Sequence, residues 1–117
     1  VYAYEASRPD ATGASPGVKS ARACSKPGVK PWASLTYAEA DAACKAAGKR
    51  LCSEAEWRRA CETASGCKYG TEAMCTTAQP GVCNTQEHDG DAAAGDQDVA
   101  LATGTRAACF ANWGAAG

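Results

Sequence analysis

The chain has little of what usually fills a protein core. Only 7% of its 117 residues are aromatic, and it contains one phenylalanine, one methionine and one histidine. Alanine and glycine are abundant instead. Because small side chains bury little apolar area, we expect a thin core for a single domain of this length.

Other absences narrow the function. The net charge is −1 and no basic patch with interleaved aromatic residues appears, so nucleic-acid binding is not expected. No apolar run approaches the roughly 18 residues that a membrane-spanning helix needs, and no signal-peptide pattern is present. We therefore expect no membrane span and a mature, processed or partial chain.

Cysteine, by contrast, is frequent. The chain has eight cysteines, an even number, as a set of disulfides requires. The eight are Cys24, Cys44, Cys52, Cys61, Cys67, Cys75, Cys83 and Cys109. Zinc knuckles, thioredoxin-like motifs and c-type haem sites need a Cys-x-x-Cys pair, and the closest spacing here is from Cys61 to Cys67. We predict disulfides at all eight positions, and hence an extracytoplasmic protein that is secreted, periplasmic or displayed on the cell surface.

The connectivity of these disulfides stays open. Cys67 and Cys75 flank a short polar stretch that suits a local bridge, but each could pair with a distant cysteine instead. Eight cysteines allow about a hundred pairings, and the sequence does not choose among them. Each bridge that closes a loop of about 15 residues adds about 3 kcal/mol in the chain-entropy model, so several bridges can offset a weak core.

The first third of the chain is predicted to be mostly irregular. Residues 1–7 suit a strand, because Tyr2 and Tyr4 lie on one face of an extended chain. Residues 8–31 are dense in proline and glycine and are predicted to form a loop that Cys24 anchors.

A capping box predicts the first helix. Thr36 and Glu39 have the Thr-x-x-Glu spacing in which the two residues cap each other's backbone N–H groups. Small and apolar residues then recur at helical spacing as far as Ala47, and Gly48 is a typical C-terminal stop. We expect a helix over residues 36–47.

A second capping box, formed by Ser53 and Glu56, predicts a second helix over about residues 54–61. Its candidate inner residues are Ala55, Trp57, Ala60 and Cys61. Regularity fades after Glu62, and the only later element that we expect is a short strand at residues 99–101.

The segment that holds both helices is the most distinctive part of the chain. Gly48 to Leu51 reads Gly-Lys-Arg-Leu, and Ser53 to Trp57 reads Ser-Glu-Ala-Glu-Trp. This resembles the hallmark of the formylglycine-generating enzyme, or sulfatase-modifying-factor, family: a helix, then Gly-Lys-Arg-Leu, then Pro-Thr-Glu-Ala-Glu-Trp. Cys52 stands where the family has proline. The opening Tyr4 to Ser7 is similar to the family's early Tyr-Glu-Val-Thr strand, and the match is weak after Glu62.

The resemblance implies a fold. It is α+β, a variant of the C-type-lectin-like fold, with two short helices on small twisted strands and long disulfide-pinned loops. Residues 1–117 would form a single, incomplete domain, because the family's catalytic cysteine pair, which binds copper in the true oxidases, lies in a later part of the family domain. We therefore assign no catalytic residue. Either a C-terminal continuation or a second chain would complete the domain.

The resemblance also suggests a calcium site. The family commonly holds Ca²⁺ with an asparagine after the second helix and an aspartate further on, which correspond here to Asn84 and Asp96, with Asp98 nearby. Carboxylate and amide oxygens in irregular loops are the ligands that Ca²⁺ prefers. The alternative is a solvated acidic loop.

Two further sets of polar residues have plain structural interpretations. Arg50, Glu56 and Trp57 belong to the family signature, and we interpret them as a partly buried structural ion pair beside a tryptophan. His88, the single histidine, is interpreted as an exposed loop residue, because no motif places a nucleophile beside it.

Two functions remain open. The first is a non-catalytic, secreted or surface-displayed binding or structural module, such as a subunit of an extracellular assembly, with a protein partner or self-association. The alternative is the N-terminal part of a copper-dependent formylglycine-generating oxidase, or of a related iron-dependent sulfoxide synthase, whose catalytic residues lie outside this chain. A small disulfide-rich toxin or inhibitor is disfavoured, because such proteins lack the helical signature.

Overall fold

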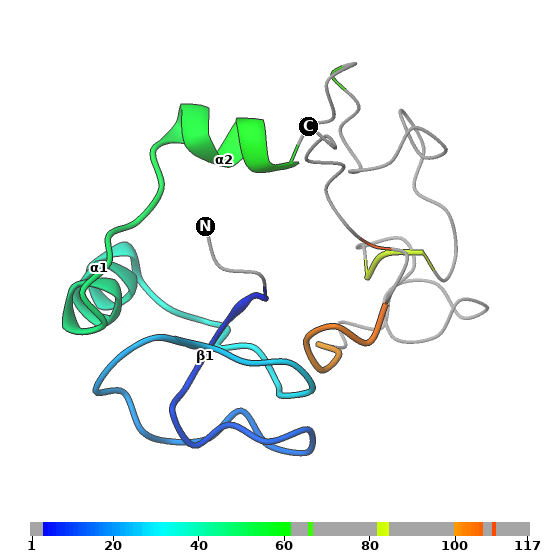
Figure 1. Cartoon of the computed structure of the whole chain (residues 1–117). Coiled ribbons are helices and arrows are strands. Elements are labelled where there is room, and N and C mark those ends of the chain that lie inside the picture. Colours follow the sequence, from blue (N-terminus) through cyan, green and yellow to red (C-terminus); the bar gives the residue numbers. More distant parts are fainter. Residues whose placement is uncertain (1–3, 62–65, 67–81, 85–99, 107–108, 110–117) are drawn as a thin grey trace. The chain divides into compact units, whose positions relative to one another are not determined.

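The computed structural model describes residues 4–61, 66, 82–84, 100–106 and 109 (Figure 1). In chain order the elements are β1 (Ala6–Ser7), β2 (Cys24–Ser25), α1 (Tyr37–Ala46) and α2 (Glu54–Cys61). The chain divides into two compact units, which are Val1–Leu51 with Ala100–Thr105, and Cys52–Val99 with Arg106–Gly117. In the part of the chain that the structure describes, no helix has the length and apolar character needed to cross a membrane.

The sheet of the first unit is a pair of two-residue antiparallel strands. Ala6 pairs with Ser25, and Ser7 pairs with Cys24. Ser7 is fully buried, and the Ser25 hydroxyl donates to the carbonyl of Tyr4 at 2.9 Å. The described part of the strand is therefore shorter than the sequence predicted, because the chain turns directly after Ser7 and enters the proline-containing loop.

The segment of residues 8–31 is irregular except at β2, a strand that the sequence did not predict, and specific contacts hold it in place. The carboxylate of Asp10 accepts hydrogen bonds from the backbone N–H groups of Val18 at 3.1 Å and Lys19 at 3.0 Å. These bonds lower the pKa of Asp10, because they stabilise its charged form. Gly17 lies against this carboxylate with φ 76°, and a Cβ there would come within 2.9 Å of Asp10 Cγ and closer still to Oδ1.

A distant segment completes the first unit. The backbone N–H of Thr103 donates to the carbonyl of Val29, its carbonyl accepts from Gly28, both at 2.8 Å, and its hydroxyl donates to the carbonyl of Lys26. Thr103 is 4% exposed, so these bonds are shielded from water. The predicted strand at residues 99–101 is not formed by Ala100 and Leu101, because pairing with the loop begins only at Thr103.

Helix α1 confirms the first capping box. Thr36 is the N-cap, and its hydroxyl and backbone N–H both donate to Glu39 Oε2, at 2.7 and 2.8 Å. Past the C-cap, Gly48 has φ 69°, its N–H donates to Lys45, and the N–H of Lys49 donates to Cys44, each at 2.9 Å. This is the paired hydrogen bonding of a Schellman motif, which explains why a glycine ends the helix.

One face of α1 is held against the loop before β2. Ala43 and Ala23 are each 5% exposed, and the N–H of Ala23 donates to the carbonyl of Ala43 at 3.0 Å. The small side chains permit this close backbone approach. The described core of the first unit consists of alanine, serine and threonine side chains, and this agrees with the thin core expected from the composition.

Helix α2 begins as the second capping box predicted. The backbone N–H of Ser53 donates to Glu56 Oε2 at 2.8 Å, and the N–H of Glu56 donates to Ser53 Oγ at 3.3 Å. Of the predicted inner residues, Ala60 is 8% exposed, whereas Ala55 is exposed and Trp57 is 61% exposed. Helical spacing predicts which residues share a face, but not which neighbour covers that face, so the prediction was wrong for Ala55 and Trp57.

Candidate binding site beside helix α1

A hollow of about 550 Å³ opens in the first unit between α1 and the loops that precede it. One wall is the edge of α1 that carries Ala42, Ala43 and Ala46. Because these side chains are single methyl groups, they leave room beside the helix. Three larger groups lie around this room: the guanidinium of Arg8, the indole of Trp32 and the carboxylate of Glu39. Leu35, Ala21 and two serines complete the described lining.

The Arg8 guanidinium is held in place by two contacts. Its Cζ lies 4.3 Å from the centroid of the Trp32 ring, and Nη1 donates to the carbonyl of Val18 at 3.1 Å. Trp32 is itself anchored, since its backbone N–H donates to the carbonyl of Ala6 in β1 at 2.8 Å. A planar guanidinium stacked on an aromatic ring is pre-oriented, and its remaining N–H groups suit a carboxylate.

Glu39 supplies the opposite charge. Its Oε2 atom accepts two hydrogen bonds from Thr36 in the capping box. These bonds lower the pKa of Glu39, and the positive charge of Arg8 contributes a smaller lowering. Glu39 is therefore ionised at neutral pH. Among the described residues, Arg8 and Glu39 are not joined by an ion pair within 4.0 Å, so the two charges share the hollow without neutralising each other directly.

The backbone of the hollow has one strained position. Ser34 has φ 59°, and it is the only residue other than glycine with a positive φ in the ranges that the structure describes. It lies between Trp32 and the N-cap Thr36 and lines the hollow. A non-glycine residue in the left-handed region costs free energy, and such positions are frequent at binding sites.

Arg8 and Trp32 were not identified from the sequence. Trp32 lies at the start of the family-like segment, but no motif assigns it or Arg8 a binding role, and the two residues lie 24 positions apart. Glu39 was identified, but only as a capping residue. The one available signal was a charged residue directly after a strand, which is too common to predict a site.

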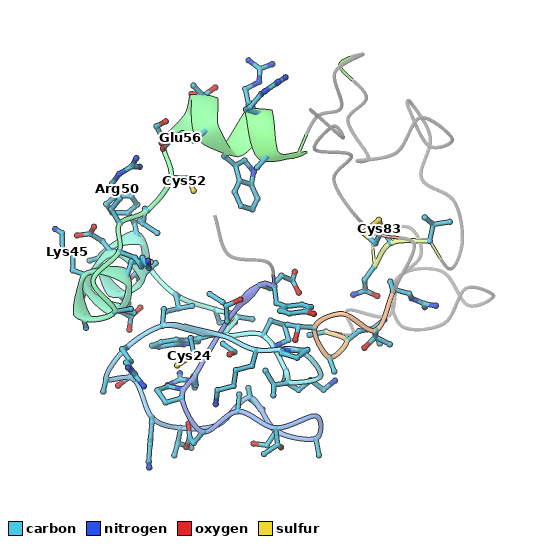
Figure 2. The ribbon with its side chains drawn as sticks, viewed as in Figure 1. Cys24, Lys45, Arg50, Cys52, Glu56 and Cys83 are labelled. Carbon is cyan, nitrogen blue, oxygen red and sulfur yellow. A yellow bond between two sulfur atoms is a disulfide. The ribbon has the colours of Figure 1, made fainter. Side chains whose placement is uncertain are left out.

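The signature residues Arg50, Glu56 and Trp57 are all exposed. Arg50 Nη1 donates to the carbonyl of Leu51 at 3.1 Å, and Glu56 caps α2 through Ser53. In Figure 2, Arg50 lies on the segment that follows α1, and Glu56 lies in the first turn of α2. The predicted partial burial of these residues was therefore wrong, whereas the ion pair itself stays a prediction.

The cysteines divide into two groups. Cys83 and Cys109 form a disulfide, seen at the Cys83 label in Figure 2, with their Cα atoms 4.9 Å apart. Cys24, Cys44 and Cys52 are free thiols in this structure, which departs from the prediction that all eight cysteines pair. No described cysteine is bonded to any of these three. The proposed local bridge between Cys67 and Cys75 lies outside the described residues, as does the side chain of Cys61.

Two predicted sites lie mostly outside the described residues. Asn84 is described and exposed, whereas Asp96, Asp98 and His88 fall outside. The calcium site therefore stays a prediction. Among residues 4–61, 66, 82–84, 100–106 and 109, no three His, Cys, Asp or Glu side chains come close enough to hold a metal ion.

The arrangement of two capped helices, a minimal sheet and extended loops defines a small α+β scaffold. The family model of the sulfatase-modifying factor enzyme 1-like domain matches residues 5–106, and the chain belongs to this family. This confirms the resemblance drawn from the helical signature. No curated protein and no solved structure matches the chain.

Proposed function

We propose that this chain is a non-catalytic, extracytoplasmic binding or structural module built on the formylglycine-generating-enzyme-like scaffold, in its C-type-lectin-like variant. Family membership supports the scaffold. The hollow beside α1 supports a binding role, because it combines an oriented cation, an anion and an aromatic ring in a concave surface.

The observation that carries this proposal is that polar side chains of the described residues are hydrogen-bonded to the backbone. Asp10 holds the loop before β2, Glu39 and Glu56 each cap a helix, and Thr103 fastens a distant segment to the first unit. Each of these groups is hydrogen-bonded to backbone atoms. Groups committed to the backbone stabilise the fold, and they are poorly placed to exchange protons with a substrate.

The extracytoplasmic location is supported by the disulfide between Cys83 and Cys109. Disulfides persist in oxidising compartments and are rare where cellular thiols are kept reduced. A binding role also suits the fold, because long loops on a rigid scaffold commonly carry recognition. The predicted calcium at Asn84, Asp96 and Asp98 would stiffen such a loop if it is bound.

The test is an activity assay. The purified chain is incubated with a cysteine-containing sulfatase peptide, copper, oxygen and a thiol reductant, and the peptide is then examined by mass spectrometry for conversion of its cysteine to formylglycine. A serine-substituted peptide and a catalytically active family enzyme are the controls. We expect no conversion by this chain. Conversion above the enzyme-free rate would refute the non-catalytic role.

Family membership also supports the alternative of an oxidase or sulfoxide synthase with catalytic residues outside this chain. The same assay, repeated on the natural polypeptide as it is expressed, separates the two proposals. Activity in that polypeptide and none in the present chain would establish the alternative.

A further inference from the structure

We propose that the hollow beside α1 binds a small zwitterion of the α-amino-acid type, with the carboxylate of the ligand on Arg8, its ammonium group on Glu39 and its side chain against the alanine edge of the helix. This inference rests on the binding role proposed above and names the chemical class of the ligand.

The anionic end of the ligand is assigned to Arg8. The guanidinium uses one N–H on the carbonyl of Val18 and stacks on Trp32, which fixes its plane. It lines the hollow, so its other N–H groups are available there. Charge-assisted hydrogen bonds from a planar guanidinium to a carboxylate are among the strongest that a side chain makes, and they favour a carboxylate held by two N–H groups.

The cationic end is assigned to Glu39. Both hydrogen bonds from Thr36 go to Oε2, and Oε1 accepts none from the residues that the structure describes. One carboxylate oxygen is therefore committed to the helix cap, and the other remains for a ligand. The cap also holds the carboxylate still, so that an ammonium group meets an oriented acceptor.

The charge balance of the hollow selects between ligand classes. Among the residues that the structure describes, Arg8 and Glu39 are the only ionisable side chains that line the hollow, and their charges cancel. A phosphate or sulfate would gain from Arg8 but would be repelled by Glu39. A simple cation would be attracted by Glu39 but repelled by Arg8. A molecule with one charge of each sign can pair with both groups. Arg8 and Glu39 form no ion pair with each other, so both charges are complementary to such a ligand.

The size of the hollow suits such a ligand. Its volume of about 550 Å³ exceeds that of a single amino acid and lies within the usual range for small-molecule sites. Ala42 and Ala46 are both exposed residues on its helical wall. An aliphatic side chain of the ligand can pack on these methyl groups and on Leu35, which favours a medium-sized apolar amino acid over a charged one.

The experiment is a titration of the intact chain by isothermal calorimetry, with ligand-observed NMR for weak binding. The probes are L-leucine, its methyl ester, which lacks the anion, N-acetyl-L-leucine, which lacks the cation, and sulfate. We expect saturable binding of L-leucine and at least roughly tenfold weaker binding of the three others, since each loses one charge-assisted contact. No saturable binding of L-leucine up to about 10 mM, or equal binding of the ester, would overturn the proposal.

Four variants test the assignment of each end. Arg8→Gln and Glu39→Gln each remove one charge, and glutamine at position 39 can still complete the capping box. Ala46→Leu fills the hollow from an exposed helix position. Arg22→Gln removes the same charge as Arg8→Gln at an exposed arginine that does not line the hollow.

The expected pattern is specific. Arg8→Gln, Glu39→Gln and Ala46→Leu each weaken L-leucine binding about tenfold or more, whereas Arg22→Gln does not. Glu39→Gln leaves the weak binding of N-acetyl-L-leucine unchanged, because that probe has no ammonium group; a merely unfolded variant would lose it. Unchanged L-leucine binding in Arg8→Gln or Glu39→Gln refutes the proposal. Failure here leaves the non-catalytic role intact, since only formylglycine formation bears on that role.

Discussion

The left-handed backbone conformation at the end of helix α1 can be tested quantitatively. Gly48 has φ 69°, and a Cβ built there would meet no atom within 4 Å. Gly48→Ala therefore isolates the cost of placing an L-residue in the left-handed region, roughly 1–2 kcal/mol. Alanine also restricts the unfolded chain, which returns about 0.4–1 kcal/mol to the folded state. We expect a net loss of about 1 kcal/mol in the free energy of unfolding.

Gly17 provides the contrasting position. Its φ is 76°, nearly that of Gly48, but a Cβ there would also lie 3.0 Å from the backbone nitrogen of Ala11 and strike the carboxylate of Asp10. Gly17→Ala therefore adds a steric overlap to the same backbone cost, and forced repacking typically costs a further 1–3 kcal/mol or so. Gly28→Ala is the matched control, because Gly28 has φ 70° and open space around it, as Gly48 has.

The assay is urea unfolding of the three variants and the parent chain, followed by far-UV circular dichroism with a common m-value. Gly48→Ala and Gly28→Ala should shift the midpoint by similar amounts, and Gly17→Ala should shift it clearly further. Equal shifts for all three would refute the close approach of Gly17 to Asp10. A stabilised Gly48→Ala would refute the left-handed helix end.

Three further predictions concern a buried hydrogen bond, a helix cap and a disulfide that stabilise the fold. Thr103→Val removes the buried hydroxyl that donates to Lys26, and it should cost about 1–3 kcal/mol in urea unfolding, whereas Thr103→Ser keeps the hydroxyl and should lose less. The folded-state pKa of Glu39 is lowered from 4.5, so the ionised carboxylate stabilises the fold above that pH, and this stabilisation is lost as the pH falls through the folded pKa. Glu39→Gln should therefore make the melting temperature fall less steeply at acid pH than it does in the parent chain. An unchanged acid dependence would contradict this. Joint replacement of Cys83 and Cys109 by serine opens a loop with a sequence separation of 26 and should cost about 3.5 kcal/mol in the chain-entropy model. Reduction of the parent chain should destabilise it at least as much, and a melting temperature that does not change on reduction would contradict this prediction.

The sequence predicted disulfides but not which cysteines form them. An even count without Cys-x-x-Cys pairs favoured disulfides, and Cys83–Cys109 agrees with that preference. The count could not select this pair among so many pairings, nor show that Cys24, Cys44 and Cys52 would be unbridged in the structure. Pairing depends on Cα separation and side-chain direction, which spacing along the chain does not determine. Alkylation of the unreduced protein, followed by peptide mapping, would compare these three thiols directly with the bridged pair.

The hollow beside α1 also could not be predicted from the sequence. Glu39 was recognised as a cap from its neighbour three residues before it, because capping is local. Arg8 and Trp32 approach each other only because the loop folds back on β1, and the hollow exists only because the facing side chains of α1 are alanines. No spacing rule connects these groups, so their combined charge and shape could not be read from the chain.

The sequence by itself determined the local structure and the family. Both helices begin where a capping box placed them, α1 ends at its glycine, and the Gly-Lys-Arg-Leu segment identified the family that the match over residues 5–106 establishes. These features depend on residues within one or two helical turns of each other. Only the tertiary structure decided that Thr103 closes onto residues 26–29, that Cys83 pairs with Cys109, and that a cation and an anion share one hollow. Each of those depends on chain segments far apart in sequence, which only the folded backbone brings together.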